Sequence, residues 1–181
     1  MTRLINNGLS LQFGGNTISM PTRYDDWFLP STGELTAMYN ELKVYGVGDF
    51  NSALYWSSTE FNATNAHYVN FITGVNSLNI PKGQVEVSRA SRSFSGTVGQ
   101  YSYRDIGPAG GWIYWFENST YFEAAPSDFE NSVWSYVLSS IGSTNFDIGT
   151  GQDNTLAIIN QVGHTGSAAQ LCVDYYTFGV I

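Results

Sequence analysis

Few residues of this chain have the types and spacing that acid–base or metal chemistry requires. The sequence holds two histidines, His67 and His164, and one cysteine, Cys172. Neither histidine has a histidine, a cysteine or a group of acids three or four residues away, as a metal site on one helix face would need. Cys172 stands among apolar neighbours in AAQLCV, which is typical of a buried side chain rather than a nucleophile. The sequence therefore predicts no metal site and no cofactor.

The two adjacent acids of YDDWFLPSTGEL, Asp25 and Asp26, point to opposite sides of an extended segment and cannot act together as acid and base. The favoured role of Asp26 is structural: its carboxylate accepts hydrogen bonds from backbone or from Arg89 or Arg92, while Trp27 turns into the core. Arg89 and Arg92 could instead bind an anionic ligand, but an ion pair inside the fold is the favoured interpretation. No G-x-S-x-G, G-x-G-x-x-G or P-loop pattern occurs, so the sequence indicates no enzyme.

The predicted binding surface is a run rich in aromatic, amide and hydroxyl side chains, YWSSTEFNATNAHYVNF. Rigid aromatic rings beside small polar groups make a general recognition face, and such rings can also stack on sugars. An alternative interpretation, favoured for the aromatic residues, places them in the core on short strands, whereas the loop from Asn62 to Asn65 is expected to be exposed. The candidate residues of this surface are Tyr55, Trp56, Asn62, Asn65, His67 and Tyr68.

The composition suits one domain that is rich in strands and loops. The chain has 181 residues, with many tyrosines, phenylalanines and glycines and few charges. Its net charge of −8 argues against nucleic-acid binding, because the seven basic residues are scattered rather than clustered. A single cysteine excludes an internal disulfide. The sequence also predicts neither a signal peptide nor insertion into a membrane, since it lacks a long apolar run.

The strongest local pattern predicts a helix from about residue 32 to residue 43. Ser31 and Glu34 form an S-x-x-E capping box, and Pro30 stops the helix from extending backwards. Apolar residues then recur on one helix face: Leu35, Met38, Tyr39 and Leu42.

Two further helices are expected, one from Asp153 as the N-cap to Gly163 and one that begins near Ser167. Strands are expected in LSLQF, NTISM, ALYWSSTE, AHYVNFITG, VEVSRASRSF and YYTFGVI. GGWIYWF and YFEAA, on either side of ENST, predict a hairpin with a four-residue loop. The fold class is therefore α+β, with short antiparallel strands and two or three short helices.

Seven segments together resemble a known module. YDDWFLPSTGEL, YWSSTE and VSRASRSF resemble the second half, and GPAGGWIYWF, YFEAAPSD, IGTGQDNTLAIINQ and SAAQLCVDY the first half, of a C-type-lectin-like domain. That domain occurs in many uncharacterised bacterial and phage proteins and is similar to the C-terminal domain of bacterial collagen-like adhesins. Sugar-binding C-type lectins carry calcium-binding tripeptides and a Trp-Asn-Asp motif that this chain lacks. The resemblance therefore does not imply a calcium-dependent sugar site.

The two halves occur in the opposite order to that of the family: the family's first half comes second here. The simplest explanation is a circular permutation. Residues 1–23 would form an arm, 24–94 the second half, 95–104 a Gly/Ser-rich linker and 105–181 the first half. Permutation is tolerated where the original termini lie close together at the surface. The alternatives are an exchange of halves between subunits and a chain cut from a tandem array, and permutation within one domain is favoured over both.

The resemblance and the composition together lead to the hypothesis of a non-enzymatic bacteriophage virion protein: a head decoration, a fibre or a tail adhesin. The arm would dock on other virion proteins or on sister subunits of a homo-oligomer, a trimer by analogy with fibres. The lectin-like module would face a host-surface glycan or protein. The alternative is a bacterial surface adhesin domain that binds glycans. A hydrolytic or modifying enzyme is disfavoured for want of a motif.

Overall fold

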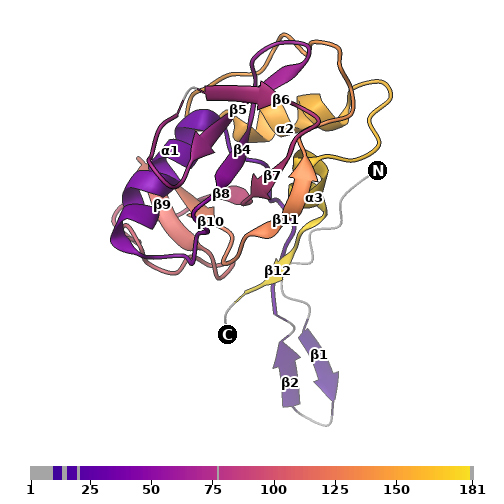
Figure 1. Ribbon diagram of the computed structural model, residues 1–181. Coiled ribbons are helices and arrows are strands. Elements are labelled where there is room, and N and C mark those ends of the chain that lie inside the picture. The colour runs from indigo at the N-terminus through magenta and orange to yellow at the C-terminus, as the bar shows by residue number, and fades with distance from the viewer. Residues whose placement is uncertain (1–9, 14–15, 20, 77, 180–181) are drawn as a thin grey trace.

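Two sheets form the framework of this protein. The computed structural model describes residues 10–13, 16–19, 21–76 and 78–179. A five-stranded sheet has the order β11-β7-β4-β5-β6, and a three-stranded sheet has the order β8-β10-β9 (Figure 1). The larger sheet comprises β4 (Leu54–Glu60), β5 (Asn65–Asn70), β6 (Leu78–Pro81), β7 (Val85–Ser88) and β11 (Phe129–Val133). The smaller one comprises β8 (Ser91–Ser95), β9 (Trp112–Glu117) and β10 (Thr120–Ala124).

Both segments assigned to family halves contribute strands to both sheets. From 24–94 come β7 and β8, and from 105–181 come their antiparallel partners β11 and β10. The architecture is α+β, as predicted. One pairing departs from the expected antiparallel pattern: β4 and β7 run parallel. The reason is topological, because β4, β5 and β6 form a meander and the chain must then cross back to the other side of β4.

Helix α1 (Thr32–Glu41) begins with the predicted capping box. The Ser31 hydroxyl accepts a hydrogen bond from the backbone N–H of Glu34 at 3.2 Å, and the Glu34 carboxylate accepts one from the N–H of Ser31 at 2.7 Å. The apolar face of the helix is buried against both sheets. A 3₁₀ turn, η1 (Lys43–Tyr45), continues the helix and ends at Gly46, whose φ of 70° is the left-handed conformation typical of a helix end.

The other two helices lie behind the large sheet in the view of Figure 1. Helix α3 (Ala168–Asp174) begins where predicted, and its N-cap Ser167 accepts a hydrogen bond from the N–H of Gln170 at 3.0 Å. Helix α2 (Gly151–Ile159) begins two residues before the predicted N-cap, so that Asp153 lies in its first turn. No cap side chain is needed at this earlier start, because the N–H of Gly151 reaches the carboxylate of Glu34, 3.4 Å away.

The strands β3 (Arg23–Tyr24), β6 and β11 were not predicted from the sequence. Two of the predicted strand segments also differ from the observed ones. The loop of the β9–β10 hairpin has two residues rather than four, because Glu117 and Thr120 pair with each other; Asn118 adopts a φ of 53° there. VEVSRASRSF is not one strand but two, β7 and β8, which belong to different sheets. The break at Arg89 and Ala90 lets the chain pass from the large sheet to the small one.

The N-terminal arm contains a hairpin of β1 (Ser10–Phe13) and β2 (Asn16–Ser19), which pair antiparallel as LSLQF and NTISM predict. Residues 1–9, 14–15 and 20, also assigned to the arm, lie outside the described residues. Figure 1 shows this hairpin projecting from the body below a small two-stranded sheet. That sheet pairs β3 (Arg23–Tyr24) with β12 (Thr177–Phe178), so the two ends of the segment 24–179 lie side by side.

Two clusters of apolar side chains make the core. One lies between α1 and the sheets and includes Leu35, Met38, Tyr55 and Phe71. The other lies beneath α2 and α3 and includes Trp27, Leu29, Trp56, Trp134 and Ile158. Within the described part of the chain, no helix is long and apolar enough to cross a membrane.

The segment 95–104, predicted as a linker, is held against β10. The Tyr121 hydroxyl donates a hydrogen bond to the carbonyl of Thr97 at 2.7 Å and accepts one from the N–H of Gln100 at 3.0 Å. The ring of Tyr121 also lies edge to face with that of Tyr101. This connection is therefore an ordered turn that packs on the small sheet.

Candidate functional site

The two aromatic residues of β4 that were candidates for a binding surface lie in the core. Tyr55 and Trp56 are each 0 % exposed, because β4 is a central strand of the large sheet, with α1 over one face and α2 over the other. Their polar atoms are used inside the fold. The Tyr55 hydroxyl donates to Asp128 at 2.5 Å, and the Trp56 indole N–H donates to the carbonyl of Ser132 at 3.0 Å. Neither residue can contact a partner.

His67 and Tyr68, on β5, are also largely inside. His67 is 5 % exposed and packs between the rings of Phe61 and Phe146, at centroid distances of 5.3 and 4.6 Å. Tyr68 is half-buried and packs against the core cluster that holds Trp56. Of the rings that pack together here, Phe61 and Phe146 are the most exposed to solvent. Neither was among the candidate binding residues.

The loop after β4 is exposed at Asn62, as predicted, and its amides shape the loop. Asn62 Oδ1 accepts hydrogen bonds from the N–H groups of Thr64 and Asn65, both at 2.9 Å. Asn65 is half-buried, and its amide donates to Asn79 Oδ1 on β6 at 2.9 Å. The side-chain oxygen of Asn62 and the side-chain amide of Asn65 are thus engaged with neighbours.

The predicted internal ion pair of Asp26 is formed by Arg92. The guanidinium makes two hydrogen bonds to Asp26, at 2.7 and 3.0 Å, and one to Glu123 at 2.5 Å. Burial raises the pKa of Glu123, although Arg92 and the N–H groups of Ala109 and Gly111 act in the opposite direction. Because its guanidinium is shared between two carboxylates, Arg92 is not placed to bind an anionic ligand.

Arg89 is likewise internal and fully buried. It donates to Asp128 at 2.7 Å and to the carbonyls of Gly48 and Ala125 at 2.9 and 2.7 Å, and it lies 4.0 Å from the ring centroid of Phe50. The structural interpretation of Arg89 is therefore correct. Its partner Asp128 ends the segment YFEAAPSD, but nothing local in that segment identifies the basic residue that Asp128 contacts.

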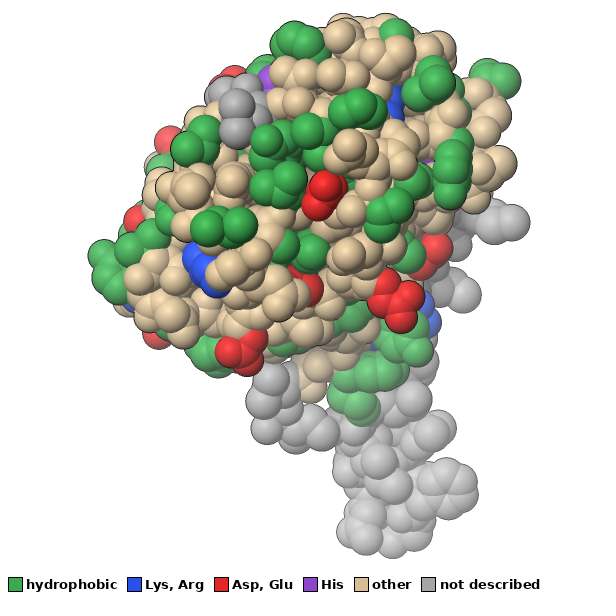
Figure 2. Space-filling model, viewed as in Figure 1, with side chains coloured by type: hydrophobic (Ala, Val, Ile, Leu, Met, Phe, Trp, Pro, Cys, Tyr) green, Lys and Arg blue, Asp and Glu red, His purple; other side chains and the backbone are tan. Residues whose placement is uncertain are grey.

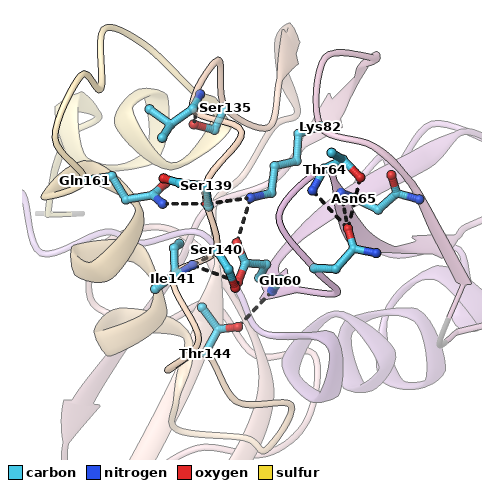
Figure 3. A network of polar contacts seen from close by, with 12 residues as sticks. Glu60, Thr64, Asn65, Lys82, Ser135, Ser139, Ser140, Ile141, Thr144 and Gln161 are labelled. Atoms are coloured by element: carbon cyan, nitrogen blue, oxygen red, sulfur yellow. Dashed lines mark hydrogen bonds and ion pairs between the residues drawn. The ribbon is translucent and has the colours of Figure 1, made fainter.

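A third buried ion pair joins Lys82 to Glu60, with 2.7 Å between Nζ and Oε1 (Figure 3). The Glu60 carboxylate also accepts hydrogen bonds from the Ser140 hydroxyl and from the N–H groups of Ile141 and Gly142. Burial alone would raise the pKa of Glu60, but Lys82 and these N–H groups hold it below its usual value. Glu60 thereby holds residues 140–142 against the large sheet. Both members of the pair are engaged, so neither is free for catalysis.

A cleft of about 450 Å³ opens beside the first turn of α1. One wall is the helix, and the other is the segment from Phe146 to Ile148. The walls approach closely because residue 33 is glycine: a Cβ there would lie 2.6 Å from the carbonyl oxygen of Phe146, to which the Gly33 N–H donates at 2.8 Å. The residues that line the cleft are Thr32, Gly33, Thr36, Asn76, Phe146, Asp147 and Ile148.

Partly buried hydrogen bonds hold the second wall in place from behind. The side chain of Asn154 accepts from the N–H of Asn145 at 2.8 Å and donates to its carbonyl at 2.7 Å. The Ser31 hydroxyl donates to the carbonyl of Asp147 at 2.9 Å, and Glu34 accepts from the N–H of Gly149 at 2.8 Å. The wall is therefore preformed, which lowers the entropy lost on binding.

The carboxylate of Glu34 lies directly behind this wall. It is shielded from water, and this burial raises its pKa to about 7, although the hydrogen bonds from Ser31, Gly149 and Gly151 lower it. Glu34 thereby joins the beginning of α1 to the beginning of α2, and its protonation state can influence how firmly the wall is held.

Phe146 and Asp147 offer a ligand an exposed ring and an exposed charge. Phe146 is 41 % exposed. Asp147 is exposed, and its carboxylate has no hydrogen-bond or ion-pair partner among the described residues. The backbone N–H groups of the first helical turn are engaged, that of Thr32 by Thr59 and that of Gly33 by Phe146, so the helix N-terminus is not open to an anion. The cleft thus offers a ring, a carboxylate and neutral polar groups.

A second groove, of about 370 Å³, runs between β11 and α3, with Val85, Tyr136 and Leu171 exposed along it. Within the described part of the chain, no three histidine, cysteine or acidic side chains gather in a way that could hold a metal ion. Each hollow holds an exposed acid, Asp147 in the cleft and Glu130 in the groove. The cleft at α1 is the stronger candidate site, because several hydrogen bonds fix one of its walls.

The wider surface is neutral to acidic. Lys82, Arg89 and Arg92 are buried, and Arg23 and Arg104 each lie within 4 Å of an acid. Figure 2 shows few basic side chains on the face in view, among many uncharged ones. Comparison of this chain with protein-family models, with curated proteins and with solved structures finds no match.

Proposed function

We propose that this protein is a non-enzymatic binding module of a bacteriophage particle, a head decoration, fibre or tail adhesin, with a permuted C-type-lectin-like fold. The observation that carries the binding role is the cleft at α1. It is rigid and holds an exposed ring and an unengaged carboxylate, whereas the acids buried near Arg89, Arg92 and Lys82 are all used inside the fold.

The arrangement of the chain ends supports display on a larger assembly. The β3–β12 pairing brings both ends of the segment 24–179 to one side of the body, and the β1–β2 hairpin projects from that side (Figure 1). A protein anchored through this hairpin would present the rest of its surface outward. In this proposal the hairpin contacts other virion proteins or sister subunits, and the assembly is a homotrimer.

The second candidate is a bacterial surface adhesin domain that binds glycans. The same cleft favours it, since an exposed aromatic ring beside a hydrogen-bond acceptor suits a sugar. The two candidates differ in where the protein resides rather than in the chemistry of the site.

The experiment is mass spectrometry of purified particles of the phage that encodes the chain, combined with binding of the fluorescently labelled protein to host cells. The proposal expects the chain in the particles, in a fixed ratio to the capsid protein, and saturable binding to cells. Absence from the particles with retained cell binding would favour the adhesin. Absence of both would refute a binding role.

A further inference from the structure

We infer that the cleft between α1 and the segment 146–148 binds one pyranose ring of a neutral glycan, with Phe146 as the stacking platform and Asp147 as the hydrogen-bond acceptor. This inference rests on the proposed binding function and adds the site and the class of ligand. The surface candidates identified from the sequence do not include either residue.

Phe146 supplies an apolar platform at the mouth of the cleft. One side of its ring packs against His67, which fixes its orientation, and 41 % of the residue remains exposed. A pyranose presents C–H groups on one face, and covering them with a fixed ring removes apolar area from water at little cost in side-chain entropy. A mobile aromatic side chain would lose more freedom on binding.

Asp147 supplies the polar contact beside that ring. Its carboxylate is exposed and unengaged, and a hydrogen bond from a hydroxyl to a charged acceptor is stronger than one between neutral groups. Its backbone is fixed, because its carbonyl accepts from both Ser31 and Thr150, at 2.9 and 2.7 Å. The backbone of the acceptor is thus fixed beside Phe146, and its exposed carboxylate can turn toward a hydroxyl of a ring stacked there.

The opposite wall is neutral and polar. The Thr36 hydroxyl donates to the carbonyl of Thr32 at 2.7 Å and accepts from the amide of Asn76 at 3.2 Å. The Thr36 hydroxyl keeps a second lone pair, which can accept a hydrogen bond from a ligand hydroxyl.

Charge excludes an anionic ligand. The carboxylate of Asp147 would repel it, the N–H groups of Thr32 and Gly33 are already engaged, and the chain carries a net charge of −8. A lysine-bearing peptide would also be attracted by the carboxylate and the ring, but its binding would fall steeply with salt, whereas that of a neutral glycan would not. The cleft volume of about 450 Å³ lies within the range of about 300–1,000 Å³ that is common for small-ligand sites.

The test uses the purified full chain and nuclear magnetic resonance titration with the methyl glycosides of glucose, galactose, mannose and N-acetylglucosamine. At least one should bind the wild type in the millimolar range, because the cleft is shallow and holds one ring. Phe146→Ala and Asp147→Asn should each weaken binding roughly tenfold or more, and Phe146→Tyr should retain it. Phe61→Ala is the matched control, since Phe61 also packs on His67 and is exposed but does not line the cleft.

Three results would overturn the inference. They are no binding of any of the four glycosides, equal weakening by Phe61→Ala and Phe146→Ala, and tighter binding of a lysine-rich peptide that falls steeply with salt. A salt-independent sugar affinity would support the neutral ligand. Failure here is distinguishable from failure of the proposed function: cell binding that survives Phe146→Ala would refute this site and leave the binding role intact.

Discussion

The buried charges of this protein are each held by several partners. Lys82 contacts Glu60 and lies 4.7 Å from the ring centroid of Trp134, and Arg89 contacts an acid, two carbonyls and a ring. A buried ion pair of this kind adds little stability compared with apolar residues of the same size. Removal of one partner is nevertheless costly, because the other partner then stays charged while it is shielded from water. The arrangement therefore acts mainly on the placement of loops.

The Lys82–Glu60 pair gives a direct test of this view. Lys82→Met should lower the free energy of unfolding by about 3 kcal/mol or more, because Glu60 is then buried without its cation. The double variant with Glu60→Gln should recover part of the loss. Arg23→Gln is the control: the contact of Arg23 with Asp25 is exposed and 3.9 Å long, and its removal should change stability by less than about 1 kcal/mol. Urea denaturation measures all three, and equal effects of Lys82→Met and Arg23→Gln would contradict the prediction.

Glu34 makes stability depend on pH. Because its folded-state pKa of about 7 lies above the ordinary value of 4.5, the folded protein binds a proton that the unfolded chain does not. The resulting stabilisation is complete below about pH 4.5 and is lost as the pH rises through 7, a change of about 3 kcal/mol. When the pH is raised from about 5 to about 8, the free energy of unfolding should fall less for Glu34→Gln than for the wild type.

Denaturation curves at both pH values measure this difference. Glu117→Gln serves as the control, because Glu117 is an exposed acid on β9 and the variant should follow the wild type. Parallel pH profiles of the wild type and Glu34→Gln would show that Glu34 does not titrate in this range.

At the scale of elements, the cleft depends on the close approach of α1 and the segment 146–148. Gly33→Ala tests it, since alanine favours a helix by about 1 kcal/mol over glycine but its Cβ would collide with the carbonyl of Phe146. The collision should prevail and lower the free energy of unfolding by about 1–3 kcal/mol. Asn40→Ala, at an exposed position of the same helix, should instead stabilise slightly. Increased stability of Gly33→Ala would mean that the walls can separate.

Sequence analysis predicted the elements whose signals are local. The capping box of Ser31 and Glu34 placed α1, and Ser167 placed α3, because both caps lie within three residues of their partners. The start of α2 was wrong because Gly151 is held by Glu34, which lies more than a hundred residues away in the chain.

The candidate site was predictable only in part, for the same reason. The exposure of Asn62 follows from local composition, but Phe146 and Asp147 become a site only by meeting α1 across the fold. Tyr55 and Trp56 lie on a central strand that is covered on both faces, and their aromatic character alone could not distinguish that position from a surface. Arg92 was one of the partners expected for Asp26, beside Arg89 and the backbone. Asp128 and Glu60 lie in segments that sequence analysis singled out, but nothing local in those segments identifies the distant cations Arg89 and Lys82 as their partners.

At the scale of the molecule, each of the two main sheets contains strands from both segments, 24–94 and 105–181. The hairpin of the arm projects from the body that these sheets form (Figure 1). The buried basic residues leave a neutral to acidic surface. Such a surface suits uncharged partners and avoids polyanions. Repetition of a weak cleft on a particle would raise the overall affinity through multivalency, without any further contact in each copy.

The most direct test of the central claim, that the cleft at α1 is the binding site of a displayed module, is the binding of the labelled protein to host cells. Wild type, Phe61→Ala and Phe146→Ala would be compared at equal concentration, after thermal unfolding has shown that all three are folded. The account predicts that Phe61→Ala binds like the wild type and that Phe146→Ala loses roughly tenfold or more in affinity. Equal binding of all three proteins would contradict it.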